Sequence, residues 1–440
     1  MLNSYLLLVI GQISLLWSAG TTGFVPSIKP EIVKHSALSS YEKYLKKTNV
    51  GIIDTPIDFE NNDELQSKSH INSCFFHEDS SGVICDLLDN RNDKEYFNSV
   101  EVADVMSYLK LQKKFELTAT EKTWLEDKTL DKKFLAKVSR YISSSHGTHV
   151  AGIVAQDNSR VNILEMAAIP LKKGTVAGAK NTDEPLRQVT SADLFKLQFL
   201  IDKEIAQKML LHQNMANFIT ENKIELINGS YGQNSCEDFI LRSTLNLGLM
   251  PDPVHSKYLA RYYRTMFNKK MKKLIDQNEN TLFIYAAGNA GENNDMTPQV
   301  PATINSDQVI AVAAVDQEGN LASFSNYGPM TVDLAAPGVN INSKAIGGYN
   351  LDMNGTSQAA PQVTRTASII RSINSKLSAK EVKEIITKTV DRLPLLAGKL
   401  KSGGVLNEKR AVIAAEFSKH PSSNLDAAIL HAFNLLPEGS

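Results

Sequence analysis

Short apolar runs alternate with longer amphipathic segments along much of this 440-residue chain. The runs 50–54, 224–230 and 281–287 are rich in branched or aromatic residues and lead into glycine, asparagine or a carboxylate, as buried strands often do. Segment 191–221 places apolar residues at helical spacing and predicts one long amphipathic helix over a core. The alternation predicts an α/β chain.

Helix-start signals continue this pattern toward the C-terminus. Ser378 and Glu381 form a capping box that predicts a helix over 379–391. A second helix is expected over 408–417, and a third over 357–373, where an apolar, helix-compatible segment begins.

The run LDMNGTSQAAP, residues 351–361, places one serine where a loop meets the expected helix 357–373. Gly355 allows a tight turn and a close approach of substrate, and two following alanines leave space. Ser357 would then lie at a helix N-terminus, where free N–H groups and the helix dipole favour an oxyanion. The same residue types also form ordinary N-caps, so this run alone is compatible with a nucleophile or a cap.

A serine nucleophile needs a base, and the base needs a group that orients it. His146 opens the small-residue segment HGTHVAGIVA, and Asp54 ends an apolar strand. Asp58 is a rival carboxylate, but it lies in a polar stretch, so we prefer Asp54. Pro56 has no N–H to donate, which leaves the hydrogen bonding of Asp54 open.

The chain order Asp54, His146, Ser357 differs from the orders of chymotrypsin-like enzymes and α/β-hydrolases and is that of subtilisins. With HGTHVAG and GTSQAAP, the sequence resembles the subtilisin-like serine proteases, over roughly residues 45–59, 141–172 and 220–415. The resemblance implies a three-layer α/β fold with a mostly parallel central sheet flanked by helices. It also implies a serine endopeptidase that forms an acyl-enzyme, needs no cofactor for its chemistry and acts on protein or peptide substrates.

The resemblance assigns roles to three more segments. Asn289, at a glycine turn after run 281–287, becomes the side-chain oxyanion donor beside the N–H of Ser357; without the resemblance it would be a turn residue. The substrate pocket is expected between Ser230, Tyr231 and Gly232 on one side and Ala286, Ala287 and Gly288 on the other. Substrate would add there as a strand.

The predicted organisation is a signal peptide at 1–20, a short leader at 21–44, a peptidase domain at 45–417 and a C-terminal tail at 418–440. Insertions are expected at about 60–140, 173–190 and 235–280. The first contains helix-compatible stretches at 93–111 and 119–138, and we expect it to overhang the cleft and favour extended or flexible substrates. The third contains a basic helical run, 257–273, expected to be a solvated face or a partner surface.

Composition limits the function classes. The chain is 42% hydrophobic, enough for a large core, and its net charge of −1 gives no reason to expect nucleic-acid binding. The N-terminal apolar stretch fits a signal peptide and predicts a secreted or periplasmic protein, with membrane association only if the stretch stays uncleaved. Cys74 and Cys85 flank a short polar loop and could pair in an oxidising compartment, which would leave Cys236 free.

Candidate metal ligands occur in three places along the chain. His146 and His149 have a spacing that can bind zinc, but no third ligand accompanies them, so we expect His149 to pack within its helix. The oxygen-rich stretches 58–64 and 292–295 could hold a structural calcium ion. The alternative to an active protease is a catalytically silent subtilase fold that serves as a binding or structural module.

Overall fold

The computed structural model describes residues 46–70, 73–79, 82–87, 99–169, 185–232 and 236–438. The expected signal peptide, the leader and most of the insertion at 173–190 lie outside these ranges. Within them, no helix is both long and apolar enough to cross a membrane.

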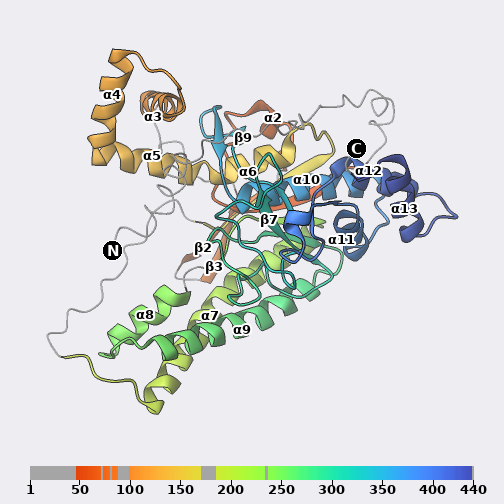
Figure 1. Ribbon diagram of the computed structural model, residues 1–440. Coiled ribbons are helices and arrows are strands. Elements are labelled where there is room, and N and C mark those ends of the chain that lie inside the picture. The colour runs from red at the N-terminus through yellow and green to blue at the C-terminus, as the bar shows by residue number, and fades with distance from the viewer. Residues whose placement is uncertain are drawn as a thin grey trace.

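The described residues form one sheet in the order β11-β12-β8-β7-β6-β5-β1-β4-β2-β3 (Figure 1). Its strands are β1 (Thr48–Asp54), β2 (Cys74–Asp79), β3 (Gly82–Leu87), β4 (Val161–Ala167), β5 (Leu226–Gly229), β6 (Leu282–Ala286), β7 (Val309–Val315), β8 (Leu334–Pro337), β11 (Asp391–Arg392) and β12 (Gly404–Val405). Neighbours from β2 to β12 pair in parallel, and the end strands β3 and β11 are antiparallel to theirs. The expected mostly parallel sheet is confirmed. A separate antiparallel hairpin joins β9 (Ile341–Lys344) and β10 (Asn350–Met353).

Helices lie on both faces of this sheet and in a lobe beside it. They are α2 (Asp63–Gln66), α3 (Ser99–Gln112), α4 (Ala119–Leu130), α5 (Lys132–Ser144), α6 (His146–Ala155), α7 (Ser191–Glu221), α8 (Cys236–Asn246), α9 (Pro253–Asp276), α10 (Thr356–Ile373), α11 (Ala379–Lys388), α12 (Glu408–Phe417) and α13 (Leu425–Leu435), with a short 3-10 helix, η4 (Pro394–Leu396). The bounds of α7 and α12 are those predicted. α10 begins one residue earlier than predicted, and α11 ends three residues earlier than predicted.

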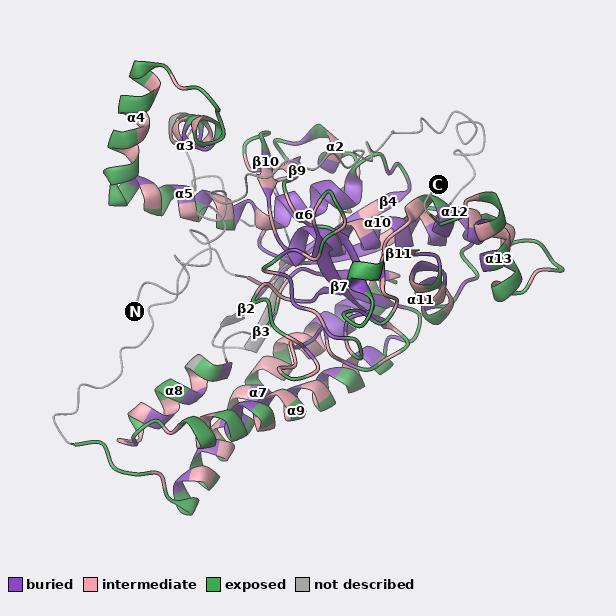
Figure 2. Ribbon diagram, viewed as in Figure 1, coloured by how far each residue is buried: buried purple, intermediate pink, exposed green. Residues whose placement is uncertain are grey.

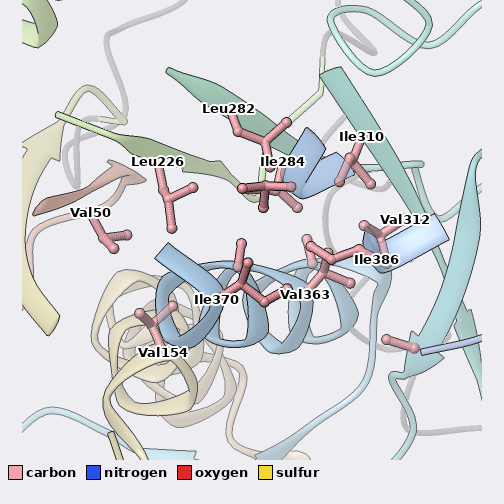
Figure 3. Packing of buried hydrophobic residues seen from close by; sticks show 14 of the residues in the cluster. Val50, Val154, Leu226, Leu282, Ile284, Ile310, Val312, Val363, Ile370 and Ile386 are labelled. Carbon is pink, nitrogen blue, oxygen red and sulfur yellow. The ribbon is translucent and has the colours of Figure 1, made fainter. Parts of the chain in front are cut away.

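Two buried clusters lie on opposite faces of the strands, because successive side chains of a strand point to opposite faces. In β6, Leu282 and Ile284 pack with α6 and α10, whereas Phe283 and Tyr285 pack with α7 and α9. Figure 3 shows strand residues such as Ile284 above α10. Burial on both faces explains why these strands are almost continuously apolar.

The first insertion is only partly a projection, because its residues also form α2 and the strands β2 and β3 that extend the sheet. Its helices α3, α4 and α5 form a helical lobe that projects from the body (Figure 1). The helix-compatible stretch 119–138 forms parts of two helices, because Asp131 ends α4 and caps α5 by accepting from Lys133 N at 2.8 Å and Phe134 N at 3.1 Å. The lobe shares a buried cluster with β10, in which Phe134 lies with Leu351. It is therefore packed onto the hairpin that leads to Ser357.

The expected C-terminal tail contains a packed helix, α13, which contacts α12. Arg410, in α12, is fully buried. Its guanidinium donates to the carbonyl oxygens of Leu436 and Pro437, both at 2.8 Å, and to that of Thr389 at 2.9 Å. The last turn of the described chain is thus held to the body.

The cysteines differ in state. Cys74, in β2, is disulfide-bonded, and Cys236, the first residue of α8, is a free and buried thiol. Cys85 lies in β3, the strand paired with β2, but its side chain lies outside the described part of the structure. Cys74 therefore forms a disulfide bond, as expected, and its pairing with Cys85 stays a prediction.

Candidate active site

Neighbouring parallel strands bring the predicted residues to one edge of the sheet. Asp54 ends β1, Ser230 follows β5, and Ala287 follows β6, and these three strands are adjacent. In open α/β sheets, the carboxyl ends of the strands commonly carry the ligand site. His146 is the first residue of α6 and Ser357 the second of α10, and these two helices pack together.

Asp54 and His146 are in contact, as predicted. Asp54 is fully buried, and its Oδ1 lies 2.7 Å from His146 Nδ1. The same oxygen accepts from Thr55 N at 2.7 Å, whereas Oδ2 is buried with no hydrogen-bond partner in the described residues. Pro56 cannot supply a backbone donor to this turn, so one carboxylate oxygen holds both bonds.

Close helix packing sets this contact. Gly147 N donates to Thr55 Oγ1 at 2.8 Å, and a Cβ at position 147 would overlap the backbone oxygen of Thr55. Only glycine allows the start of α6 to approach the end of β1 this closely, so Gly147 supports the Asp54–His146 distance.

Burial and charge act in opposite directions on His146, whose side chain is 26% exposed. Desolvation lowers the pKa of His146, but the charge of Asp54 and its hydrogen bond outweigh this effect, and the pKa is raised above its ordinary value. The imidazole is therefore a stronger base than an isolated histidine.

Ser357 is 8% exposed, and its hydroxyl donates to Ser230 O at 3.1 Å. Ser230 Oγ donates in turn to Ser357 O at 2.9 Å. Among the described side chains, no hydrogen bond joins Ser357 to His146. The serine hydroxyl must rotate away from Ser230 before His146 can accept its proton, and such contacts often form only with substrate present.

Asn289 is oriented by Thr356. Its Oδ1 accepts from Thr356 N at 2.9 Å and from Thr356 Oγ1 at 2.8 Å, so its Nδ2 group is the end left to donate. A Cβ placed on Gly355 would lie 3.3 Å from Asn289 Nδ2 and 3.6 Å from Ser357 N. Both predicted oxyanion donors therefore border the same small space beside Gly355.

Two buried asparagines hold the loop that carries Asn289, and sequence analysis did not identify either one. Asn326 Oδ1 accepts from Ala290 N at 2.9 Å and Glu292 N at 3.0 Å. Its Nδ2 donates to Asn294 Oδ1, and Asn294 Nδ2 donates to the carbonyl oxygen before Gly288, both at 2.9 Å. Asparagines in polar loop sequence give no signal of such contacts.

The two predicted pocket segments follow β5 and β6 and so lie side by side. Tyr231 differs from expectation, because its ring packs at 6.1 Å from that of Tyr285 and belongs with the core on the α7–α9 face. Its ring is therefore turned toward the core. Ala286 and Ala287 are buried, as small wall residues would be.

Gln299 fills the space between these segments, which the sequence did not suggest. A Cβ at Gly232 would overlap Gln299 Nε2, and one at Gly288 would lie 3.3 Å from Gln299 Cγ. Gln299 is partly exposed, and no hydrogen bond of its carboxamide to another described residue is present. An amide therefore lies at the position expected for the substrate side chain before the scissile bond.

Asp58, the rival carboxylate, is bound elsewhere. Its Oδ2 accepts from Gly347 N at 2.7 Å and its Oδ1 from Asn61 Nδ2 at 3.0 Å. His149 is buried, and its Nε2 lies 2.8 Å from the carbonyl oxygen of Leu351 and 3.0 Å from that of Ile341. Desolvation lowers its pKa to about 4, as for a packed neutral residue.

No cluster of three or more metal-ligating His, Cys, Asp or Glu side chains occurs among the residues that the structure describes. In the stretch 292–295, Asp295 accepts from Thr331 Oγ1 at 2.6 Å and from Met330 N at 3.1 Å. A calcium ion in either candidate stretch stays a prediction.

Known proteins resemble this chain in sequence. A family model described as the subtilase family matches residues 46–412. The thermostable alkaline protease of Halalkalibacterium halodurans is 29% identical over 255 residues, 58% of this chain and 55% of that protein. Subtilisin-like protease 2 of Plasmodium falciparum is 26% identical over 275 residues, 62% of this chain and 17% of that protein. The chain thus spans 55% or less of these relatives.

Among solved structures, a cold adapted subtilisin-like serine proteinase matches with a TM-score of 0.44 at 17% identity, over 82% of this chain and 89% of that one. A likeness at this level carries no functional argument. The family model, however, covers most of the chain and includes all four residues assigned to catalysis. The protein belongs to the subtilase family.

Proposed function

We propose that this protein is a serine endopeptidase that uses Asp54, His146 and Ser357. The observation that carries the proposal is the 2.7 Å contact between a fully buried carboxylate and a histidine, at the sheet edge where α10 presents a serine. Membership of the subtilase family supports the same conclusion.

In the proposed mechanism, Ser357 Oγ attacks the peptide carbonyl while His146 Nε2 takes its proton. Asp54 holds the Nδ1–H tautomer of His146 and stabilises the cation that forms. His146 returns the proton to the leaving amine, and an acyl-enzyme remains. Water, activated by the same histidine, then releases the second product and restores Ser357.

The oxyanion of each tetrahedral intermediate would accept from Asn289 Nδ2 and Ser357 N. These donors are fixed before substrate binds, so they stabilise the developing charge without reorganisation. The hydrogen bonds of Asn289 to Thr356 support this role, because they leave only its amide hydrogens free.

Substrate specificity follows from the neighbouring segments. An extended peptide would add as a strand along residues 230–232, with the side chain before the scissile bond directed toward Gln299. Gln299 shortens that space and offers a neutral amide, so we expect small or neutral polar residues there. The expectation that the lobe of α3 to α5 favours extended or flexible chains stays part of the proposal.

Reaction with a fluorophosphonate probe tests the proposed function. The wild-type chain should be labelled and should cleave unfolded protein, whereas Ser357→Ala should do neither and should keep its fold. Ser67→Ala, at an exposed serine, is the matched control and should retain both properties. Wild-type protein that is neither labelled nor active would instead favour the silent binding module.

Export is a separate part of the proposal. The apolar stretch near the N-terminus supports a secreted or periplasmic location, and its processing can be measured by determining the N-terminus of protein recovered from the medium or periplasm. Recovery of unprocessed chain from the cytoplasm alone would contradict it.

A further inference from the structure

Helix α9 carries a concentration of positive charge that the whole chain does not share. Its sequence, PVHSKYLARYYRTMFNKKMKKLID, contains seven lysines or arginines and one acidic residue, whereas the full chain has 47 basic and 48 acidic residues. Arg264 pairs with Glu237, and Lys272 with Asp276. The other basic side chains of α9 make no ion pair with the residues that the structure describes.

Exposed apolar side chains lie at the N-terminal end of this helix and of its neighbour, α7. Val254 is 75% exposed and Tyr258 51% on α9, and Phe195 is 73% exposed and Phe199 64% on α7. In Figure 2 both helices contain residues coloured as exposed toward the end that lies away from the body. Single apolar residues on a protein surface are common, but four large ones at one end of a helix pair form an exposed apolar patch, which is typical of an interaction site.

Side-chain contacts show that these four residues belong to one surface. Gln198 Nε2, next to Phe199, donates to Tyr258 Oη at 2.9 Å, and one turn later Tyr262 Oη donates to Asp202 at 3.1 Å. The helices therefore run side by side in the same direction. Their buried faces, with Leu197 and Leu259, point to the core, so the four exposed residues lie on the outer side.

The position of this end relative to the active site follows from topology. α7 leads to the start of β5, and α9 leads to the start of β6. A helix that returns the chain to the start of a parallel strand begins on the side where the strands end. The exposed end of α7 and α9 thus projects on the side of the sheet that carries Ser357.

We propose that this end of α7 and α9, defined by Phe195, Phe199, Val254 and Tyr258 with basic Lys257 and Arg261, docks on an anionic lipid surface. Aromatic and branched residues beside lysine and arginine are the combination that membrane-surface helices use: the apolar groups enter the headgroup boundary and the cations bind acidic lipids. The near-zero net charge of the chain does not oppose this, because charges beyond about 8 Å are screened at physiological ionic strength.

Docking in this orientation would hold the proposed active site near a membrane and favour substrates attached there. The surface itself does not depend on the proposed peptidase activity, since none of its residues contacts Ser357, His146 or Asp54 in the structure.

Vesicle co-sedimentation of the full chain tests the proposal. Wild-type protein should bind phosphatidylcholine vesicles that contain phosphatidylserine, bind pure phosphatidylcholine vesicles much less, and lose binding as salt is added. Each basic residue near an anionic surface contributes about a five-fold change in binding, so Lys257→Gln with Arg261→Gln should weaken binding by about 25-fold. Phe195→Ser with Phe199→Ser should weaken it by about tenfold or more.

Matched controls lie near the C-terminal end of the chain. Leu430→Ser changes a leucine that is 62% exposed, and Lys419→Gln removes an exposed lysine, and both variants should bind as wild type does. All variants should keep the same cleavage of a soluble peptide, or the same circular dichroism if the chain proves inactive, which shows that they fold.

Two results would overturn the proposal. Unchanged vesicle binding in both double variants would mean that another segment, such as the apolar N-terminal stretch, is responsible. The second result combines weak vesicle binding with tight binding to polyglutamate. If the Lys257 and Arg261 variant lost the polyglutamate binding and the phenylalanine variant kept it, the surface would be one for an acidic protein instead.

Discussion

The proposed oxyanion donor gives the sharpest prediction. Asn289→Ala removes the free amide N–H and should lower kcat by about 10² to 10³ fold, or about 2.7–4 kcal/mol, the size typical of losing this donor in a subtilisin. KM should change little, because the charge that Asn289 stabilises exists only in the transition state. The substitution also removes the acceptor of two Thr356 donors that lie in a fully buried residue. Stability should therefore fall by roughly 1–3 kcal/mol.

Kinetics on a chromogenic peptide and urea unfolding measure the two effects separately. Asn293→Ala is the matched control, because Asn293 lies in the same loop and, among the residues that the structure describes, its side chain accepts only from Asp295 N, at 2.9 Å. That variant should keep its kcat within a few fold. A loss confined to KM, or a near-normal kcat for Asn289→Ala, would refute the assignment and leave Asn289 as a turn residue.

Further tests concern the carboxylate, the pocket, the buried His149 and the lobe. Asp54→Asn should lower kcat by about 10⁴ fold and Asp58→Asn far less, and equal losses in peptide assays would contradict the choice of carboxylate. Gln299→Gly should raise kcat/KM for large residues before the scissile bond, relative to alanine, by about tenfold or more; an unchanged ratio would exclude Gln299 from the pocket. The native pKa of His149 is lowered to about 4, so the unfolded chain binds the extra proton. Stability should fall as the pH drops from about 6.5 to 4, by an amount on the order of 3 kcal/mol, and His149→Gln should flatten that slope in urea unfolding. Shortening the tip of the lobe between α3 and α4 should change the ratio of casein to short-peptide cleavage, and an unchanged ratio in a folded variant would show that the lobe does not restrict access.

Sequence predicted the sheet and the positions of the proposed catalytic residues because these depend on local pattern. An apolar run that ends in Asp54 is a buried strand with a carboxylate at its end, and the glycine-rich turn around Asn289 follows another such strand. Their roles remain predictions, but their placement at one sheet edge follows from parallel pairing.

Other features depend on contacts between distant segments, which hydrophobic periodicity does not contain. Asn326 supports the Asn289 loop from more than 30 residues away, and Gln299 reaches Gly232 from more than 60. The helix-compatible stretch 119–138 is divided at Asp131 by a side-chain cap, a local contact that helix-compatible composition does not reveal. In the site itself, the contacts that the sequence did not predict are mainly polar contacts between distant segments, such as those of Asn326 and Gln299.

The buried guanidinium of Arg410 has a consequence for choosing where to shorten this chain. The family match ends at residue 412, which suggests a natural end for a minimal catalytic fragment. Two of the carbonyl groups that Arg410 binds, however, belong to Leu436 and Pro437, beyond α13. A fragment cut at the family limit would end inside α12, and Arg410 would lose these two acceptors and the Phe433 ring that covers it, keeping Asp391, Thr389 and Val390. We therefore expect the unit that folds to be longer than the unit that sequence comparison recognises.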